Sequence, residues 1–445
     1  MTVVFWFRRD LRLQDNEALS YAGSLGKVFP TYVVGERFND LTPIRQHSLV
    51  ESLRSLSADL PKGLQILQSF EHLLGFAKQV GATRVIATKA FDTEGMLEQA
   101  HMAELLYSAG IALELKGSNY AVEPGTVRKD DGTALKVYTP FYKRWIHHGW
   151  SKPISLDVDA LDWGEPLKVS EYPEPSGPAP FPIKAGEAFA KRTFARFSAR
   201  ALSNYDEHRN RPDLSGTSHL SHALAHGEIH PRTLLIQLGD SAGHETFRKE
   251  LAWREFYADV MFHNPHTLDD YFNPDYAKMH YADPVQDKAL LTAWELGQTG
   301  YPIVDAAMRQ LRQSGWMHNR ARMIVASFLI KDLHFEWQVG ARYFEKWLTD
   351  FDPASNSHGW QWTAGCGTDA SPYYRVFNPV LQGEKFDPNG DYVRKYVPEL
   401  AHISGAAIHQ PWLLVDGLSK GYPAPIVDHA AERDESLARL KELKA

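Results

Sequence analysis

The sequence predicts an α/β domain with a doubly wound, Rossmann-like parallel sheet, followed by an all-α domain. Three observations carry this prediction. Short β-rich runs alternate with helical patterns over residues 1–115, prolines crowd residues 152–182, and helical periodicity alone continues from residue 184. Alternation at this spacing is typical of a parallel sheet. At 445 residues the chain also exceeds the usual length served by one hydrophobic core, so at least two domains are expected.

Five short runs in the first part of the chain are predicted to be strands. They are Val3–Phe7, Val28–Val34, Leu64–Leu67, Arg84–Ala87 and Ala112–Leu115. Helical periodicity separates them, for example over Ile44–Ala58 and Glu94–Ala109. A parallel sheet of this kind binds ligands beyond the carboxyl ends of its strands. The glycine-rich signatures of dinucleotide and nucleoside triphosphate sites are, however, missing from the sequence.

Seven prolines between residues 152 and 182 indicate a connection that runs over the surface. We therefore expect an α/β domain over residues 1–130, a linker over residues 131–183 and a helical domain over residues 184–445. In the helical domain, apolar residues recur with helical spacing over several segments. These include His244–Val260, Ala289–Leu296, Ile303–Gln313, Asn319–Leu333 and Val339–Leu348, and Ala430–Ala445 is expected to form a charged helix.

Composition and charge narrow the class of protein. Cys366 is the only cysteine, so no internal disulfide can form and a reducing compartment is expected. The N-terminus lacks the features of a signal peptide and no apolar run reaches the length of a membrane span, so we expect a cytoplasmic protein outside the membrane. A net charge of −7 disfavours a dedicated nucleic-acid binder. The basic stretch over residues 191–211 could still bind phosphate, or be a solvated helix face.

Two segments of the helical domain concentrate charge and indole. Gly315–Met323 places two arginines, an asparagine and a histidine among apolar residues, and Asp352–Trp362 places two tryptophans around a glutamine. Burying guanidinium and carboxylate groups is costly unless they pair with each other or hold a polar ligand. The two segments together predict a ligand site; the alternative for each alone is an internal ion pair with aromatic packing.

Two further segments fit the same site. The hydroxyl-rich loop Ser215–Ser221 can present hydroxyls and backbone amides to phosphate, while Glu250 and Trp253 lie three apart on one helix face. A flavin would account for all four segments. Four histidines also occur at helical spacings, but nothing else in the sequence demands a metal, and none is expected. They are His219, His222, His226 and His230.

With these segments the chain resembles the photolyase/cryptochrome family, specifically the bacterial photolyases that repair cyclobutane pyrimidine dimers. The resemblance covers nearly the whole chain, from Phe5–Asn16 through Lys136–Phe141, and is strongest over Thr299–Arg309 and Thr368–Pro379. It implies that reduced FAD absorbs blue light and donates an electron to a dimer flipped out of UV-damaged DNA, whose cyclobutane ring then splits. No obligate protein partner is implied, and a monomer is expected.

The resemblance also implies the residues that bind FAD. They are Tyr205, Thr217, Ser218, His219, Leu220, Ser221, Glu250, Arg322, Asp350, Phe351, Asp352 and Asn356. His219 stands where this type of protein usually has arginine. Arg322 and Asp350 are implied to form a salt bridge beside the flavin ring, and Asn356 to face flavin N5. Plant-like cryptochromes typically have aspartate there, which can protonate the flavin, whereas asparagine favours the reduced anion used in repair.

The lesion pocket is implied in the same way, with Glu250, Asn319 and Asn356 as its catalytic residues. Further contacts with the lesion or the DNA are Trp253, Arg254, Tyr257, Arg320, Met323, Trp362 and Arg209. The tryptophans would offer flat walls to the flipped pyrimidines, and a protonated Glu250 could donate to a pyrimidine carbonyl. Photolyases for the six-four lesion carry a second histidine where this chain has Asn319, so the resemblance favours the cyclobutane lesion.

Trp360 and Trp337 match the proximal and middle members of the tryptophan chain that re-reduces oxidised flavin in this family. The third member should lie between Ala282 and Lys288, where no tryptophan occurs. Either the nearby Tyr281 is the terminal donor or the chain ends elsewhere, and slower or less efficient photoreduction is expected. The family's α/β domain holds an antenna chromophore, a methenyltetrahydrofolate or a deazaflavin. Phe91–Glu94 lies where antenna contacts are expected, and folate is favoured. The alternatives are a signalling cryptochrome without repair and a flavin oxidoreductase acting in the dark.

Overall fold

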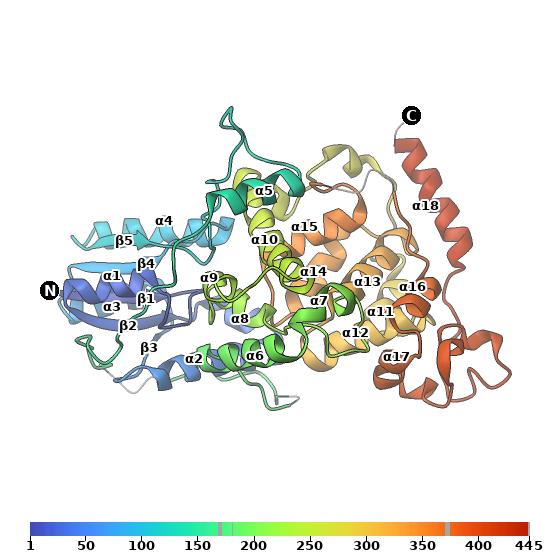
Figure 1. Cartoon of the computed structure of the whole chain (residues 1–445), viewed down its shortest axis with the longest axis horizontal. Helices are drawn as coiled ribbons and strands as arrows, with labels where there is room; N and C mark the ends of the chain where they lie inside the picture. Colours follow the sequence, from blue (N-terminus) through green and yellow to red (C-terminus); the bar gives the residue numbers. More distant parts are fainter. Residues whose placement is uncertain (168–170, 180, 370–373, 444–445) are drawn as a thin grey trace. The chain divides into compact units, whose positions relative to one another are not determined.

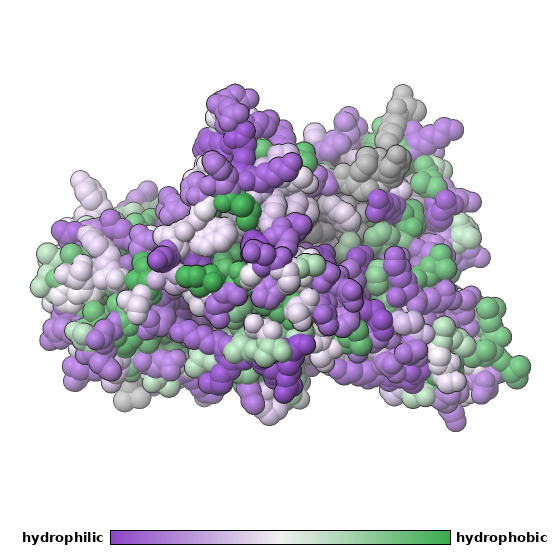
Figure 2. All heavy atoms as spheres, in the orientation of Figure 1, coloured by the Kyte–Doolittle hydropathy of each residue, from purple (hydrophilic) through white to green (hydrophobic). Residues whose placement is uncertain are grey.

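The computed structural model describes residues 1–167, 171–179, 181–369 and 374–443 (Figure 1). The remaining residues, outside the description, belong to the predicted linker, to the Thr368–Pro379 run and to the last two positions of the chain. The chain forms two compact units, one of residues 1–200 and 218–265 and one of residues 201–217 and 266–445. In the described part of the chain, no helix is both long and apolar enough to cross a membrane. Hydrophilic residues cover most of the face in Figure 2.

The first unit is built on a five-stranded parallel sheet with the strand order β3-β2-β1-β4-β5. Its strands are β1 (Thr2–Phe7), β2 (Lys27–Val33), β3 (Gln65–Leu67), β4 (Arg84–Thr88) and β5 (Ala112–Lys116). All five predicted strands are confirmed, each to within one residue at either end. Central β1 pairs with β2 and β4, so that Val4 lies between Phe29 and Val85. Because helices cover both faces of this strand, the side chains on both faces are buried and its sequence is an unbroken apolar run.

Alternate side chains of β1 enter two separate cores. Val3 and Phe5 pack with α1 (Glu17–Leu25) and α2 (Pro43–Asp59) on one face. Val4 and Trp6 pack with α3 (Phe70–Gln79) and α4 (Thr93–Tyr107) on the other. The two-residue period of a strand produces this division. The α/β fold predicted for the first part of the chain is therefore confirmed.

The first unit also contains helices beyond the sheet. They are α5 (Tyr138–His148), α6 (Glu187–Arg200), α8 (Ser221–Ala225), α9 (Pro231–Leu235) and α10 (Ala242–His263). Helix α5 lies inside residues 131–183, where we expected a linker. Its buried Tyr138, Phe141 and Trp145 recur at helical spacing and pack against α10, where the ring centroids of Phe141 and Phe256 are 5.2 Å apart. The helical spacing of these three aromatic residues predicts a helix, but we assigned the region to a linker because of the prolines that follow it.

The second unit is helical throughout its described residues. Its helices are α7 (Tyr205–His208), α11 (Lys288–Leu296), α12 (Pro302–Ser314), α13 (Asn319–Lys331), α14 (Trp337–Trp347), α15 (Pro353–Ala364), α16 (Pro379–Phe386), α17 (Asp391–Tyr396) and α18 (His429–Leu443). Short 3₁₀ turns in the chain are η1 (Glu36–Asp40), η2 (Leu202–Asn204), η3 (Pro265–Leu268), η4 (Pro274–Lys278), η5 (Pro398–Leu400), η6 (Gly405–His409) and η7 (Pro411–Leu413). Helices α12 and α13 supply much of the core, and α15 packs against α13 and α14. The predicted all-α fold is confirmed.

Asp305 in α12 is a structural centre of the Thr299–Arg309 run. Its carboxylate is 0% exposed and accepts hydrogen bonds from the backbone N and Oγ1 of Thr299, both at 2.7 Å. It also accepts from the backbone N of Gly300 at 3.0 Å and from the Tyr422 hydroxyl. These donors fold the loop before α12 onto the helix, because a buried carboxylate must be satisfied. The most distinctive sequence run therefore shapes the backbone here.

Lys331 in α13 carries a buried amine. It is 2% exposed, its Nζ donates to the carbonyl oxygen of Arg375, and it lies 4.1 Å from the ring centroid of Tyr374. Burial lowers the pKa of Lys331 from its ordinary value to about 7, because the apolar surroundings disfavour the charged amine. The folded protein therefore releases this proton at a lower pH than the unfolded chain does.

We expect Lys331→Met to flatten the dependence of stability on pH. Between about pH 7 and about pH 10, the unfolded wild-type chain keeps the Lys331 proton that the folded chain has lost, so wild-type stability rises with pH relative to the variant. The difference approaches about 1.4 kcal/mol per pH unit in the middle of this window. Urea unfolding across the window measures it. Lys346→Met, at an exposed position of α14, is the control, and equal slopes for Lys331→Met and wild type would contradict the prediction.

Candidate functional site

An ion pair between a partly exposed arginine and a buried carboxylate joins α13 to the loop before α15 in the second unit. Nη2 of Arg322 donates to Oδ2 of Asp350 at 2.6 Å, and Nε of Arg322 donates to the carbonyl oxygen of Met317 at 2.8 Å. The Asp350 side chain is 1% exposed. Its other oxygen, Oδ1, is buried and accepts no hydrogen bond from any residue that the structure describes. The pair implied by the resemblance is present, and it leaves a buried acceptor to which a polar ligand can donate.

Helix α15 begins next to this ion pair. Asp352 caps it, because its Oδ1 accepts from the backbone N of Ser355 at 2.9 Å, and Pro353 occupies the first turn. Asn356 and Trp360 lie one turn apart on the same side of the helix. The Nδ2 of Asn356 donates to the carbonyl oxygen of Ala341 in α14 at 3.1 Å. This bond orients the amide and leaves the carbonyl oxygen and the second N–H of the Asn356 side chain to bind another partner.

Trp360 and Trp337 are both deeply buried, at 2% and 1% exposure. The Trp360 ring packs edge-on against Phe344 at 4.9 Å and Trp294 at 6.3 Å between centroids. Within the described residues, neither indole Nε1 has a hydrogen-bond partner. Buried indole N–H groups usually find one, so both tryptophans are unusual for core residues. Trp362, the third indole near α15, is half-buried.

The start of α13 carries Asn319 and Arg320, two of the lesion contacts predicted in this unit. His318 caps the helix by accepting from the backbone N of Arg320 at 3.1 Å, and Asn319 beside it is exposed. Nε and Nη2 of Arg320 donate to Oδ1 of Asn210 at 3.2 and 2.8 Å, and its guanidinium lies 4.5 Å from the Phe386 ring centroid. Sequence analysis did not identify Asn210, because its partner lies about a hundred residues away.

Helix α10 of the first unit carries Glu250, Trp253, Arg254 and Tyr257 of the predicted lesion contacts. Glu250 and Tyr257 are half-buried. The Trp253 ring stacks on Tyr138 of α5, with centroids 3.7 Å apart and an interplanar angle of 6°. One face of this indole is therefore occupied, and a base can stack only on the other. The sequence did not predict this contact, because it did not predict helix α5, which carries Tyr138.

Two polar side chains that follow Trp253 along α10 are engaged inside the first unit. The Nη1 and Nη2 of Arg254 donate to the carbonyl oxygens of Asn119 at 3.0 Å and Leu224 at 3.3 Å. Glu255 is buried and accepts from Nε1 of Trp145 at 2.6 Å. Burial raises the pKa of Glu255 to about 7. These bonds fix α10, and a DNA phosphate would have to compete with two carbonyls for Arg254.

The predicted phosphate loop spans the boundary of the two compact units in the sequence. Tyr205, which is buried, and Thr217 belong to the second unit, and residues 218–221 belong to the first. In the first unit, Oγ of Ser218 accepts from the backbone N of Leu220 at 3.3 Å. His219 is exposed and has a φ of 53°, a conformation uncommon for residues other than glycine. Arg209 is half-buried at the C-terminal cap of α7.

The remaining predicted residues lie in different surroundings. Met323 and Phe351 are half-buried in the second unit, as is Tyr281, whose hydroxyl donates to the carbonyl oxygen of Tyr276 at 3.0 Å. In the first unit, Phe91 is buried against Phe262, with centroids 6.0 Å apart. Asp92, the residue that follows it, caps α4. These antenna candidates have structural partners of their own.

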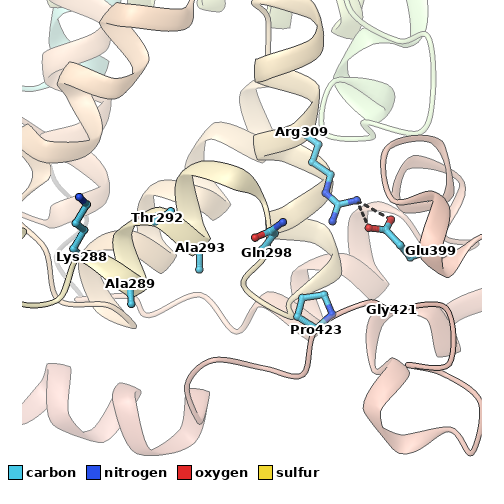
Figure 3. A pocket seen from close by; sticks show the side chains of 9 residues that line it. All are labelled: Lys288, Ala289, Thr292, Ala293, Gln298, Arg309, Glu399, Gly421 and Pro423. Atoms are coloured by element: carbon cyan, nitrogen blue, oxygen red, sulfur yellow. Dashed lines mark hydrogen bonds and ion pairs between the residues drawn. The ribbon is translucent and has the colours of Figure 1, made fainter.

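A pocket of about 690 Å³ opens elsewhere on the second unit (Figure 3). It is lined by Lys288, Ala289, Thr292, Ala293, Gln298, Arg309, Glu399, Gly421 and Pro423. At its edge, Nη1 of Arg309 donates to both carboxylate oxygens of Glu399, at 2.9 and 2.8 Å. No predicted site residue lines this pocket, so it is not the candidate functional site.

Comparison with known proteins assigns the chain to a family. A family model described as DNA photolyase matches residues 3–157, and one described as the FAD binding domain of DNA photolyase matches residues 247–442. The chain is 36% identical to the deoxyribodipyrimidine photo-lyase of Alkalihalophilus pseudofirmus, over 98% of this chain and 97% of that protein.

Solved structures agree with this match. The crystal structure of a bacterial class III photolyase from Agrobacterium tumefaciens is similar with a TM-score of 0.89 and 36% identity, over 100% of this chain and 98% of that one. A cryptochrome from Synechocystis has a TM-score of 0.85 and 28% identity, over 99% and 98% of the two chains. With more than a third of its residues shared with a photolyase along nearly its full length, the chain belongs to the DNA photolyase family.

Proposed function

We propose that this protein is a deoxyribodipyrimidine photo-lyase, which uses FAD and blue light to split cyclobutane pyrimidine dimers in DNA. The observation that carries the proposal is the ion pair between Arg322 and the buried Asp350. Asp350 keeps one buried oxygen without a donor among the described residues, next to a helix that presents Asn356 and Trp360. A cofactor with polar ring edges supplies the missing donor and accounts for the clustered charge.

The residues present fit FAD. Arg322 and Asp350 would hold the polar side of the flavin ring, with Phe351 and Asp352 beside them. Asn356, oriented by Ala341, would offer a carbonyl oxygen and no acidic proton. The phosphates would be held by Tyr205 and by the loop of Thr217, Ser218, His219, Leu220 and Ser221, with Glu250 as a further contact. When bound, FAD supplies the photochemical electron, and the protein supplies position and electrostatics.

For the lesion, we propose that Trp253 uses the face that Tyr138 leaves open and that Trp362 forms a second apolar wall. Arg320 is held by Asn210 and Phe386, so it is pre-positioned for a phosphate beside the lesion. Glu250 would donate a proton to a pyrimidine carbonyl, with Asn319 alongside. Met323, Tyr257, Arg254 and Arg209 complete the proposed contacts.

The functional boundaries in this proposal stay at residues 130 and 183. Helix α10 belongs to the first compact unit, but the family model of the FAD binding domain matches the chain from residue 247, so we keep it in the catalytic domain. We further propose methenyltetrahydrofolate as the antenna of the α/β domain, and a monomer acting in the cytoplasm. The second candidate function is a cryptochrome-type photoreceptor, which the similarity to the Synechocystis cryptochrome favours and Asn356 disfavours.

A repair assay tests the function. The purified, flavin-loaded protein is incubated with an oligonucleotide that carries one thymine cyclobutane dimer, in darkness and under blue light. We expect two thymines to be restored only in the light. Glu250→Gln keeps an N–H donor but has no acidic proton to transfer, so it should slow repair about 10²-fold, the lower end of what a general acid contributes, without loss of flavin absorbance.

The matched control is Glu245→Gln in the same helix, where Glu245 contacts Tyr142 and Arg248. This variant should repair at the wild-type rate. A flavin-loaded wild-type protein that leaves the dimer intact under blue light would move the function to a photoreceptor or to the six-four lesion.

A further inference from the structure

Two tyrosines continue outwards from Trp337 in the second unit. The Tyr271 ring lies edge-on to Trp337, with centroids 6.2 Å apart and an interplanar angle of 88°. Tyr271 in turn stacks with Tyr281 at 6.4 Å and 23°. Tyr271 is 4% exposed and Tyr281 is half-buried, so exposure increases away from Trp337. Tyr281 immediately precedes the stretch where a third tryptophan was expected, whereas sequence analysis gave no signal for Tyr271.

A carboxylate lies beside the inner tyrosine. The Tyr271 hydroxyl donates to Oε1 of Glu336 at 3.1 Å. Glu336 stands at the N-cap position of α14, directly before Trp337, yet its side chain makes no capping hydrogen bond. Burial raises the pKa of Tyr271 well above its ordinary value, so the phenol keeps its proton until it is oxidised. A carboxylate within hydrogen-bond reach is the arrangement that a proton acceptor requires.

The other titratable groups around Tyr271 do not serve this purpose. Burial raises the pKa of Cys366 to about 12 and that of Tyr281 far above its ordinary value, so both stay protonated. Asp270 is turned to the backbone, where its Oδ1 accepts from the N of Tyr271 at 2.7 Å. Among the described groups that face the Tyr271 hydroxyl, Glu336 is therefore the base.

We infer that Tyr271 is the redox residue that takes the place of the missing third tryptophan, with Glu336 as its proton acceptor. One electron passes from Tyr271 to Trp337 after Trp337 has lost an electron towards the light-excited oxidised flavin. The phenolic proton moves to Oε1 of Glu336, which leaves a neutral tyrosyl radical and a carboxylic acid. An external thiol then reduces the Tyr271 radical by one electron, which passes through the intervening Tyr281. The proton returns from Glu336 to the Tyr271 oxygen. The inference rests on the proposed function, because the flavin is the oxidant.

A second aromatic row starts from Trp360 and provides the comparison. The ring centroid of Trp294 lies 6.3 Å from that of Trp360 and 5.4 Å from that of Tyr343. The row ends at Trp347, whose ring centroid lies 6.2 Å from that of Tyr343. The Tyr343 hydroxyl, however, donates to the carbonyl oxygen of Glu295 at 2.8 Å, and Nη1 of Arg312 donates to it at 3.3 Å. An amide carbonyl is too weak a base to take the proton, and the nearby guanidinium disfavours a further positive charge. This row has the spacing but lacks the proton acceptor.

Flavin photoreduction and radical spectroscopy test the inference. The oxidised, FAD-loaded protein is illuminated with blue light and a thiol, while flavin absorbance and the electron paramagnetic resonance spectrum are recorded. We expect a tyrosyl radical in the wild type and a slower rate in D₂O than in H₂O. Tyr271→Phe should abolish the radical. Tyr271→Phe and Glu336→Gln should both slow photoreduction roughly 10²-fold, the lower end of what a positioned proton acceptor contributes.

Tyr343→Phe is the matched control and should photoreduce at the wild-type rate. Wild-type photoreduction in Tyr271→Phe, or in Glu336→Gln, overturns the inference, as does a rate lost only in Tyr343→Phe. Dimer repair by the same variants after chemical reduction of the flavin separates this test from that of the proposed function. We expect these variants to repair the dimer at the wild-type rate. If no protein, including the wild type, repaired the dimer, the proposed function would be rejected, whereas the inference about Tyr271 would still be tested by photoreduction.

Discussion

Arg322→Met is expected to lower the free energy of unfolding by about 3–5 kcal/mol and to yield protein purified without FAD. The substitution removes the cation that Oδ2 of Asp350 holds at 2.6 Å, and Oδ1 has no other donor among the described residues. A carboxylate that is 1% exposed would then be buried without a counter-charge. Urea unfolding gives the stability, and the ratio of flavin to protein absorbance gives the FAD content.

Arg309→Met is the matched control for that prediction. Arg309 pairs with Glu399 at 2.8 Å at the edge of the pocket in Figure 3, in the same unit but away from the candidate site. Its carboxylate partner is 28% exposed, so water can replace the lost cation. The expected loss is about 1 kcal/mol or less, with full FAD content. If the two variants lost stability and flavin equally, the special role of the Arg322 and Asp350 pair would be refuted.

The sheet was predictable because each strand carries its own signal. β1 is a continuous apolar run whose alternate residues enter two cores, so its ends are fixed by where burial stops. Helix α5 was not predicted, although Tyr138, Phe141 and Trp145 have helical spacing, because the prolines that follow it dominated the interpretation of that region. A helix or strand was therefore predictable from its own sequence pattern wherever no competing pattern lay next to it.

The candidate site was predictable only in part, and Gln361 shows why. In the sequence it stands between two tryptophans and adds to the polar character of a ligand site. In the structure its Nε2 donates to the carbonyl oxygen of Thr267 at 2.9 Å, and its Oε1 accepts from the backbone N of Phe272 at 2.7 Å. Gln361 therefore fastens α15 to a distant loop. A pattern of residue types does not record which far-off carbonyl a polar side chain meets.

Arg254 and Arg320 also show that residue type does not reveal the partners of a polar side chain. Both were assigned to DNA on the resemblance alone. Arg254 is held by two backbone carbonyls and Tyr120, whereas Arg320 is held by Asn210, a side chain that can yield to a phosphate. These contacts favour Arg320 over Arg254 for the proposed phosphate contact, and the order of residue types in the sequence does not make that distinction.

Gly340→Ala is expected to destabilise the protein by about 1–3 kcal/mol and to slow flavin photoreduction. A Cβ at Gly340 would lie 2.0 Å from Cη2 and 2.4 Å from Cζ3 of the Trp360 ring. That ring cannot retreat freely, because Phe344 and Trp294 pack against it. Even a methyl group must therefore displace the tryptophan that is proposed to stand next to the flavin. Thermal unfolding and the photoreduction rate measure the two effects.

Gly359→Ala is the control that makes this prediction sharp. Gly359 lies in α15, directly before Trp360, and among the described residues no other side chain or segment comes within 4 Å of the position that its Cβ would take. Alanine there fills open space and favours the helix over the unfolded chain, so stability should rise by about 0.5–1 kcal/mol. The same substitution in adjacent helices should thus have opposite signs. Equal destabilisation by both would mean that the collision with Trp360 does not determine the effect at Gly340.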